Sequence, residues 1–306
     1  MRRVVTAAVL LVLAAQEAVG RPAGTLQTQP YTYIRTLQTL QARVAGGSQP
    51  AQRLQMSLLE HIAARFAEMP VAVWRAPRNA GAAVLFVLSG GRPDAVRHLV
   101  AGDRLEPPYG RLLEGALAYV DGRRDAAIRL LKQEDGEVLP DALAGHLALI
   151  RAVLVRNKDL KAAQKLLDRA RLLMPATLVE EAALRRGVML SGEDGDRDGF
   201  VARSAVYVRN FGGSVYAPEF ERSFARLAVA LEFTGMPDAQ ARLEQIAGPL
   251  EAEGQLRFYL EVARTAMVGG DRQLTQFAAT QATTLTQPDT DDAVSETHLR
   301  AHETDL

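Results

Sequence analysis

Residues 174–186, MPATLVEEAALRR, join one helix to the next and show how this chain is built. Pro175 cannot continue a helix, so it should end the first one. Thr177 is a suitable N-cap for the second helix, and Glu180 lies three residues further on, where its carboxylate can reach back in a capping box. The stretch predicts a helix–turn–helix unit and contains no catalytic signature.

Helical periodicity extends along nearly the whole chain, and the alternation typical of strands is missing. Two apolar stripes flank the Gly46-Gly47 break and predict a first helical hairpin, with Ile34, Leu37, Leu40 and Val44 on one side and Leu54, Leu58, Ile62 and Phe66 on the other. A buried helix over 82–88 with a glycine stop and a helix over 93–100 should follow. The fold class is predicted to be all-α.

From Leu112 onward the spacing resembles a tetratricopeptide repeat. One unit turns at Asp121-Gly122 and has its small and apolar residues at Gly115, Ala127 and Leu131. The next has Leu147, Ile150 and Leu154 in its first helix and Ala163, Leu167, Ala170 and Pro175 in its second. Arg151 replaces the small residue of the pattern, and leucines replace its aromatics. We therefore expect stacked helix-turn-helix pairs in a divergent tetratricopeptide-like array.

Further hairpins are predicted up to the C-terminal region, which changes in composition. They cover 177–190 with 200–211, 218–233 with 238–250, and a pair over 256–279. Residues 283–306 are rich in Thr, Gln, Asp and Glu and predict a disordered acidic tail. The helical repeat domain is therefore expected to occupy residues 21–282.

Residues 1–20 have the pattern of a signal peptide. Arg2 and Arg3 form the basic start, Val4 to Ala15 is apolar, and Ala18-Val19-Gly20 supplies small residues for cleavage. This run is shorter than the roughly 20 apolar residues of a spanning helix, although an uncleaved anchor is the alternative. We expect export to the periplasm, with no membrane insertion after cleavage.

Composition excludes several classes of function. The chain has no cysteine, which rules out disulfides, thiolate metal sites and cysteine nucleophiles. Its 36 basic and 36 acidic residues cancel, so no overall field favours nucleic acid or an anionic membrane. No cofactor is predicted either.

Two groupings resemble metal sites. The stretch 194–199, Asp-Gly-Asp-Arg-Asp-Gly, matches the first half of a calcium-binding EF-hand loop, but the twelfth position is Ala205 instead of glutamate. An exposed turn explains it better, with calcium binding as the minor alternative. His298 and His302 lie four apart without a third ligand, so chance spacing is the better explanation.

Enzyme motifs are missing from the sequence. It has no G-x-S-x-G elbow, phosphate-binding glycine loop or zinc-protease helix. Glu180 and Glu181 could act as acids or bases only in an enclosed site, for which the sequence gives no indication. No catalytic residue is predicted, and the chain is expected not to be an enzyme.

Two neighbouring groups are candidates for contact with a protein partner. Aromatic residues and arginine are enriched in interfaces, so Tyr207, Arg209, Phe211 and Tyr216 form one candidate. Packing of the aromatics in the core is the simpler interpretation. Glu181 and Arg185, one helical turn apart, are predicted to form an ion pair and complete the set.

Several blocks together resemble the MotC chemotaxis and motility proteins. They are 30–38 (PYTYIRTLQ), 77–79 (PRN) leading to 88–91 (LSGG), 177–186, and 211–220 around Ser214-Val215-Tyr216-Ala217. The likeness extends from about Pro30 to Leu231 and consists of helix faces and turns without a catalytic motif.

This resemblance implies a periplasmic protein needed for flagellar rotation. Such a protein acts on the periplasmic part of the stator subunit MotB, and stacked helix pairs offer an extended face suited to gripping another protein. The resemblance thus implies a non-catalytic protein that stabilises MotB. A general helical-repeat scaffold for cell-envelope assembly is the alternative, and an envelope hydrolase with a helical fold is a weaker one.

Overall fold

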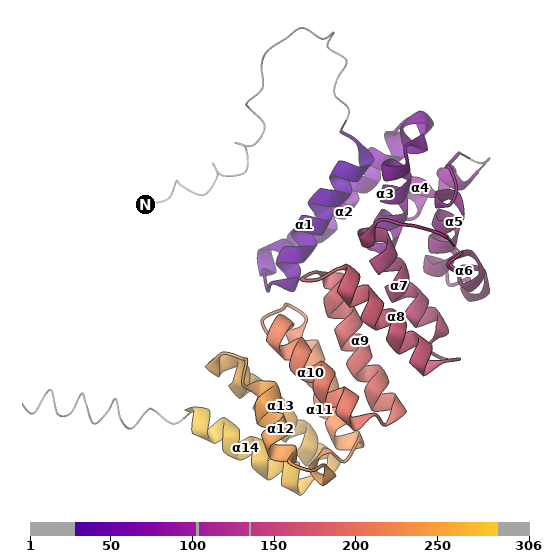
Figure 1. Cartoon of the computed structure of the whole chain (residues 1–306). Helices are drawn as coiled ribbons and strands as arrows, with labels where there is room; N and C mark the ends of the chain where they lie inside the picture. The colour runs from indigo at the N-terminus through magenta and orange to yellow at the C-terminus, as the bar shows by residue number, and fades with distance from the viewer. Residues whose placement is uncertain (1–27, 102–103, 135, 287–306) are drawn as a thin grey trace, which may run out of the picture.

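The computed structural model describes residues 28–101, 104–134 and 136–286, and there the chain forms fourteen α-helices and no strand (Figure 1). This confirms the all-α prediction. The first seven helices are α1 (Pro30–Ala45), α2 (Gln49–Glu68), α3 (Pro77–Leu88), α4 (Asp94–Arg97), α5 (Tyr109–Val120), α6 (Arg124–Leu130) and α7 (Asp141–Val155). The others are α8 (Leu160–Leu173), α9 (Leu178–Asp194), α10 (Arg197–Phe211), α11 (Ala217–Ala230), α12 (Ala239–Ala247), α13 (Ala252–Gly269) and α14 (Arg272–Thr286).

The helices follow one another through the molecule from α1 to α14, mostly as antiparallel neighbours (Figure 1). Strong packing joins α1 with α2, α7 with α8, α9 with α10, and α13 with α14. These four hairpins match the sequence prediction. The predicted pairing of 218–233 with 238–250 is wrong, because α11 packs mainly against α13 and α12 packs mainly against α10. The helix expected over 93–100 is shorter, because α4 ends at Arg97 and a 3-10 turn continues over His98–Val100.

The N-terminal core is built around the aromatic side chain of Phe66. Its ring lies 4.9 Å from that of Trp74 and 5.0 Å from that of Phe86. The predicted stripe on α2 is wrong at one end, because the Leu54 side chain is 59% exposed and the buried face instead includes Leu59. Helical spacing gives the width of an apolar face, but neighbouring helices decide which edge of it they cover.

A second core fills the C-terminal half and is more aromatic. The ring of Tyr207 lies 3.8 Å from that of Phe220, and Phe224 lies 5.0 Å from Phe200 and 5.2 Å from Phe258. A smaller alanine-rich cluster on α7, α8 and α9 lies between the two cores in the chain order. Buried apolar side chains therefore continue along the array, with a core in each half.

Helices α9, α11 and α13 lie side by side. Arg185 of α9 binds Glu219 of α11, 34 residues on, and Glu221 of α11 binds Arg257 of α13, 36 residues on. Near the other ends, a Cβ on Gly192 would lie 2.8 Å from Leu227. The three helices therefore run parallel, and we call them the inner row. The tetratricopeptide-like register of this arrangement stays a prediction.

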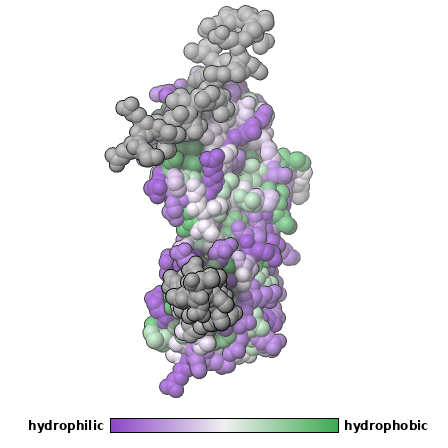
Figure 2. Space-filling view, turned by 90° about the vertical axis from the view of Figure 1, so that its left-hand side faces the viewer, coloured by the Kyte–Doolittle hydropathy of each residue, from purple (hydrophilic) through white to green (hydrophobic). Residues whose placement is uncertain are grey.

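Helix α14 ends at Thr286, so it continues past the boundary expected at residue 282. The predicted signal peptide, residues 1–20, lies outside the described residues, as does most of the predicted tail. Within the part that is described, no helix combines the length and apolar character needed to cross a membrane. Figure 2 shows mostly hydrophilic residues on one face of the molecule, with separate hydrophobic patches between them.

Candidate partner-binding site

The turn between α8 and α9 positions two consecutive glutamates at the start of α9. Thr177 caps the helix, as predicted, by accepting a hydrogen bond from the Val179 N–H at 3.3 Å. The Glu180 carboxylate reaches back but accepts from the N–H of Ala176, at 2.6 Å, one residue before the expected donor. Its other oxygen accepts from the Asn210 amide of α10 at 3.3 Å. Glu180 thus ties the start of α9 to the end of α10 in the same hairpin.

Glu181 lies in the core, with only 1% of its surface exposed. One carboxylate oxygen accepts hydrogen bonds from the Tyr207 hydroxyl at 2.9 Å and from the Ser214 hydroxyl at 2.7 Å. The second oxygen is buried without a hydrogen-bond partner. Burial raises the pKa of Glu181, while the bonds from Ser214 and Tyr207 act against this rise.

The predicted ion pair between Glu181 and Arg185 is wrong. Arg185 instead binds Glu219 of α11 at 2.8 Å, and its guanidinium lies 5.2 Å from the centre of the Tyr216 ring. Burial, followed by the Glu181 charge, raises the pKa of Tyr207. The two ends of the predicted pair therefore serve different junctions: Glu181 holds α9 against α10, and Arg185 holds α9 against α11.

The six sequence-predicted contact residues do not form one exposed surface. Glu181, Tyr207 and Phe211 are buried, so their side chains stabilise the fold beneath the surface. Arg185 and Tyr216 are half-buried and contact each other, while Arg209 is exposed. The core interpretation therefore describes the aromatics of α10, and a partner can reach three of the six: Arg185, Arg209 and Tyr216.

Two hollows of about 520 Å³ each flank Asn210 above this network. One opens toward the end of α1 and the turn before α9, and its lining includes Ala45, Pro175 and Phe211. The other opens toward α13, and its lining includes Arg209 and Arg257. Between them the α1–α2 turn approaches the loop after α10 so closely that a Cβ on Gly47 would lie 2.4 Å from the Gly213 oxygen.

Two polar residues that the sequence did not single out also link distant segments. Asn79 is 3% exposed, and its amide donates to the Val73 carbonyl at 2.8 Å and to Gln29 at 2.9 Å. His146 is 6% exposed, and its Nε2 lies 3.5 Å from the Ser89 hydroxyl after α3. Its Nδ1 lies 2.7 Å from the Ala142 carbonyl of the same helix, and burial lowers its pKa. Asn79 belongs to the block 77–79 that resembles a known family, and His146 belongs to no such block. The spacing of residues in the sequence gave no reason to expect that either side chain would link distant segments.

The residues of the acidic turn at 194–199 end one helix, cap the next and form ion pairs. Gly195 has a left-handed φ of 71° at the end of α9, and Asp196 caps α10 through the Gly199 N–H at 2.9 Å. Asp198 binds Arg242 at 2.8 Å. Across residues 28–101, 104–134 and 136–286, no three His, Asp or Glu side chains gather closely enough to hold a metal ion. His298 and His302 lie outside those ranges.

Comparison with known proteins points to one family. The sequence model described as chemotaxis protein MotC matches residues 1–300, so the likeness continues well beyond Leu231. A chemotaxis protein MotC of Rhizobium meliloti (strain 1021) is 32% identical over 292 residues, which cover 94% of this chain and 66% of that relative. The chain thus spans just under two thirds of the relative's length. No solved structure matches it significantly. Because the family model matches nearly the whole sequence, the chain belongs to the chemotaxis protein MotC family.

Proposed function

We propose that this chain is a non-catalytic periplasmic protein of the motility machinery that binds and stabilises the periplasmic part of the stator subunit MotB. Membership of the chemotaxis protein MotC family is the observation that carries the proposal. Export to the periplasm belongs to the same proposal and rests on the signal-peptide pattern of residues 1–20.

The inner row supports a role in protein binding. Helix rows of this kind present side chains from several helices to one partner, which gives a large contact area. The proposed contacts are the exposed or half-exposed side chains of Arg185 on α9, Arg209 on the neighbouring α10, and Tyr216 in the turn before α11. The buried network beneath them, centred on Glu181, would hold them in place without touching the partner.

Deletion of the gene tests the proposal at the level of the cell. The expected phenotype is cells that carry flagella but do not swim, with motility restored by the full-length chain supplied in trans. Altered cell shape or envelope integrity, with normal swimming, would instead favour the general envelope scaffold.

Purification of the tagged full-length chain from its own host tests the partner directly. Mass spectrometry of the solubilised envelope should find MotB enriched, and MotB should be degraded faster in the deletion strain. A version of MotB without its periplasmic part is the matched control and should not be recovered. Equal recovery of both versions of MotB would contradict the proposed contact.

A further inference from the structure

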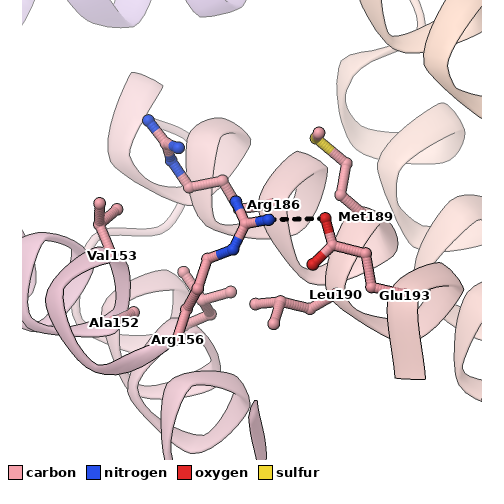
Figure 3. Close-up of a pocket in the computed structure, with 8 residues that line it drawn as sticks. Ala152, Val153, Arg156, Arg186, Met189, Leu190 and Glu193 are labelled. Carbon is pink, nitrogen blue, oxygen red and sulfur yellow. Dashed lines mark hydrogen bonds and ion pairs between the residues drawn. The ribbon is translucent and has the colours of Figure 1, made fainter. Parts of the chain in front are cut away.

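A small pocket opens between α7 and α9, on the side of the molecule that Figure 3 shows in close-up. Its volume is about 50 Å³. The deep part is apolar, because Ala152, Leu167 and Leu190 are each no more than 8% exposed. The rim carries the charged side chains of Arg156, Arg186 and Glu193.

The size of this pocket decides what it can accept. Small-molecule sites usually measure about 300–1,000 Å³, and a cavity of about 150 Å³ is needed for benzene. A volume of about 50 Å³ is too small for a ligand or an aromatic ring, but it suits the branched end of one aliphatic side chain. The pocket therefore fits an anchor residue that belongs to a larger partner.

The charges at the rim of the pocket place a second requirement on the partner, which concerns its own charge. Arg156 and Glu193 neutralise each other in an ion pair of 2.7 Å, which Figure 3 marks across the mouth. Arg186 is exposed and forms no ion pair or hydrogen bond with the residues that the structure describes. It leaves one uncompensated positive charge at the mouth, within one turn of Leu190 along α9. An acidic group on the partner would complement it.

We propose that this pocket receives a leucine, isoleucine or valine side chain from an acidic segment of the partner protein, while a carboxylate of the same segment binds Arg186. The inference rests on the proposed function, since the partner is the periplasmic part of MotB. It deepens that function by locating an anchor point between α7 and α9 whose lining includes none of the six residues singled out by sequence.

Two substitutions address the two halves of the site. Ala152→Val adds two carbon atoms to the floor of the pocket and leaves the charges unchanged. Arg186→Glu reverses the charge at the mouth and leaves the floor open. Arg53→Glu on α2 is the matched control, because Arg53 lies outside the inner row, is also exposed, and has no ion pair among the described residues. It changes the net charge by the same amount.

The measurement is the affinity of the full-length chain for the purified periplasmic part of MotB from the same host, at low and at moderate salt. Arg186→Glu should weaken binding about tenfold and lessen its dependence on salt. Ala152→Val should weaken binding several-fold at both salt concentrations. The control should stay within about twofold of the unmodified chain. Thermal melting establishes that each variant is folded. If Arg186→Glu is not folded, Arg186→Gln takes its place.

The outcomes separate this inference from the function on which it rests. If the unmodified chain binds and both variants bind equally well, the pocket is not the anchor point, although the proposed function stands. If Arg53→Glu weakens binding as much as Arg186→Glu does, the effect comes from overall charge and the inference fails. If the unmodified chain does not bind this part of MotB, the proposed function fails and the inference falls with it.

Discussion

Glu181 shows at the scale of one residue why a carboxylate can be kept in a helical core. It accepts hydrogen bonds from Tyr207 and Ser214, whose side chains are themselves buried. Glu181→Ala would leave both hydroxyls without this acceptor, and each unsatisfied group costs about 1–3 kcal/mol. We expect the variant to lose about 2–4 kcal/mol of unfolding free energy, measured by chemical denaturation.

Glu219→Ala is the control for this loss. It removes the partner of Arg185 from an ion pair in which the Glu219 side chain is 59% exposed, and exposed pairs contribute about 0–1 kcal/mol. Similar losses of unfolding free energy for both variants would show that the buried hydrogen bonds at Glu181 stabilise the fold no more than an exposed ion pair does.

The same residue gives a pH-dependent prediction. Because burial raises the pKa of Glu181 in the folded chain, the folded state takes up this proton more readily than the unfolded state does. The contribution of Glu181 to stability is therefore complete below the unfolded pKa of about 4.3 and is lost as the pH rises through the folded pKa. Glu181→Gln keeps an acceptor oxygen but does not titrate.

The stability of Glu181→Gln relative to the unmodified chain should therefore increase as the pH rises from about 4 toward 7. Denaturation curves of both proteins at several pH values measure this difference. The contribution of Asp121 to stability changes with pH in the opposite direction, because hydrogen bonds from Arg97 lower its pKa to about 2. Asp121 is present in both proteins, so its contribution cancels from the difference. A difference that is independent of pH would contradict the assigned titration.

At the scale of the helices, local rules predicted starts and turns better than contacts between distant segments. Thr177, Gly122 and Gly195 lie at the cap or turn positions expected of them, because such preferences act within a few residues. The predictions that Leu54 is buried and that Glu181 pairs with Arg185 were wrong, because both depend on which helix packs alongside. The pocket at Arg186 could not be predicted, since its lining comes from three helices, α7, α8 and α9, whose packing is not encoded in local spacing.

The α1–α2 turn provides a test of one such distant contact. Gly47 has a φ of 92°, and a Cβ there would lie 2.4 Å from the Gly213 oxygen in the loop after α10. Gly122 has a φ of 73° but has no atom within 4 Å of such a Cβ. Positive φ alone costs an alanine about 1–2 kcal/mol at either position.

Gly47→Ala should therefore destabilise the chain by clearly more than Gly122→Ala, by about 1 kcal/mol or more beyond the shared conformational cost. Unfolding free energies from urea titrations compare the two variants. The excess reports the close approach of the N-terminal hairpin to the loop after α10. Equal losses at the two glycines would mean that the hairpin moves aside without cost.

At the scale of the whole molecule, the two aromatic cores should respond separately to damage. In a row of stacked helices each unit contacts mainly its neighbours, so stability is roughly a sum of local terms. Phe66 belongs to the N-terminal core and Phe258 to the C-terminal core, and both are fully buried. Either residue changed to alanine should cost about 3–5 kcal/mol of local stability.

Hydrogen exchange read by mass spectrometry can locate that loss along the chain. Phe258→Ala should speed exchange in α11, α13 and α14 while α3 and α5 stay protected, and Phe66→Ala should give the reverse pattern. The alanine-rich cluster on α7, α8 and α9 contains neither residue, so its protection should change less than that of the damaged core in each variant. Faster exchange throughout the chain in either variant would instead show that the two cores unfold as one cooperative unit.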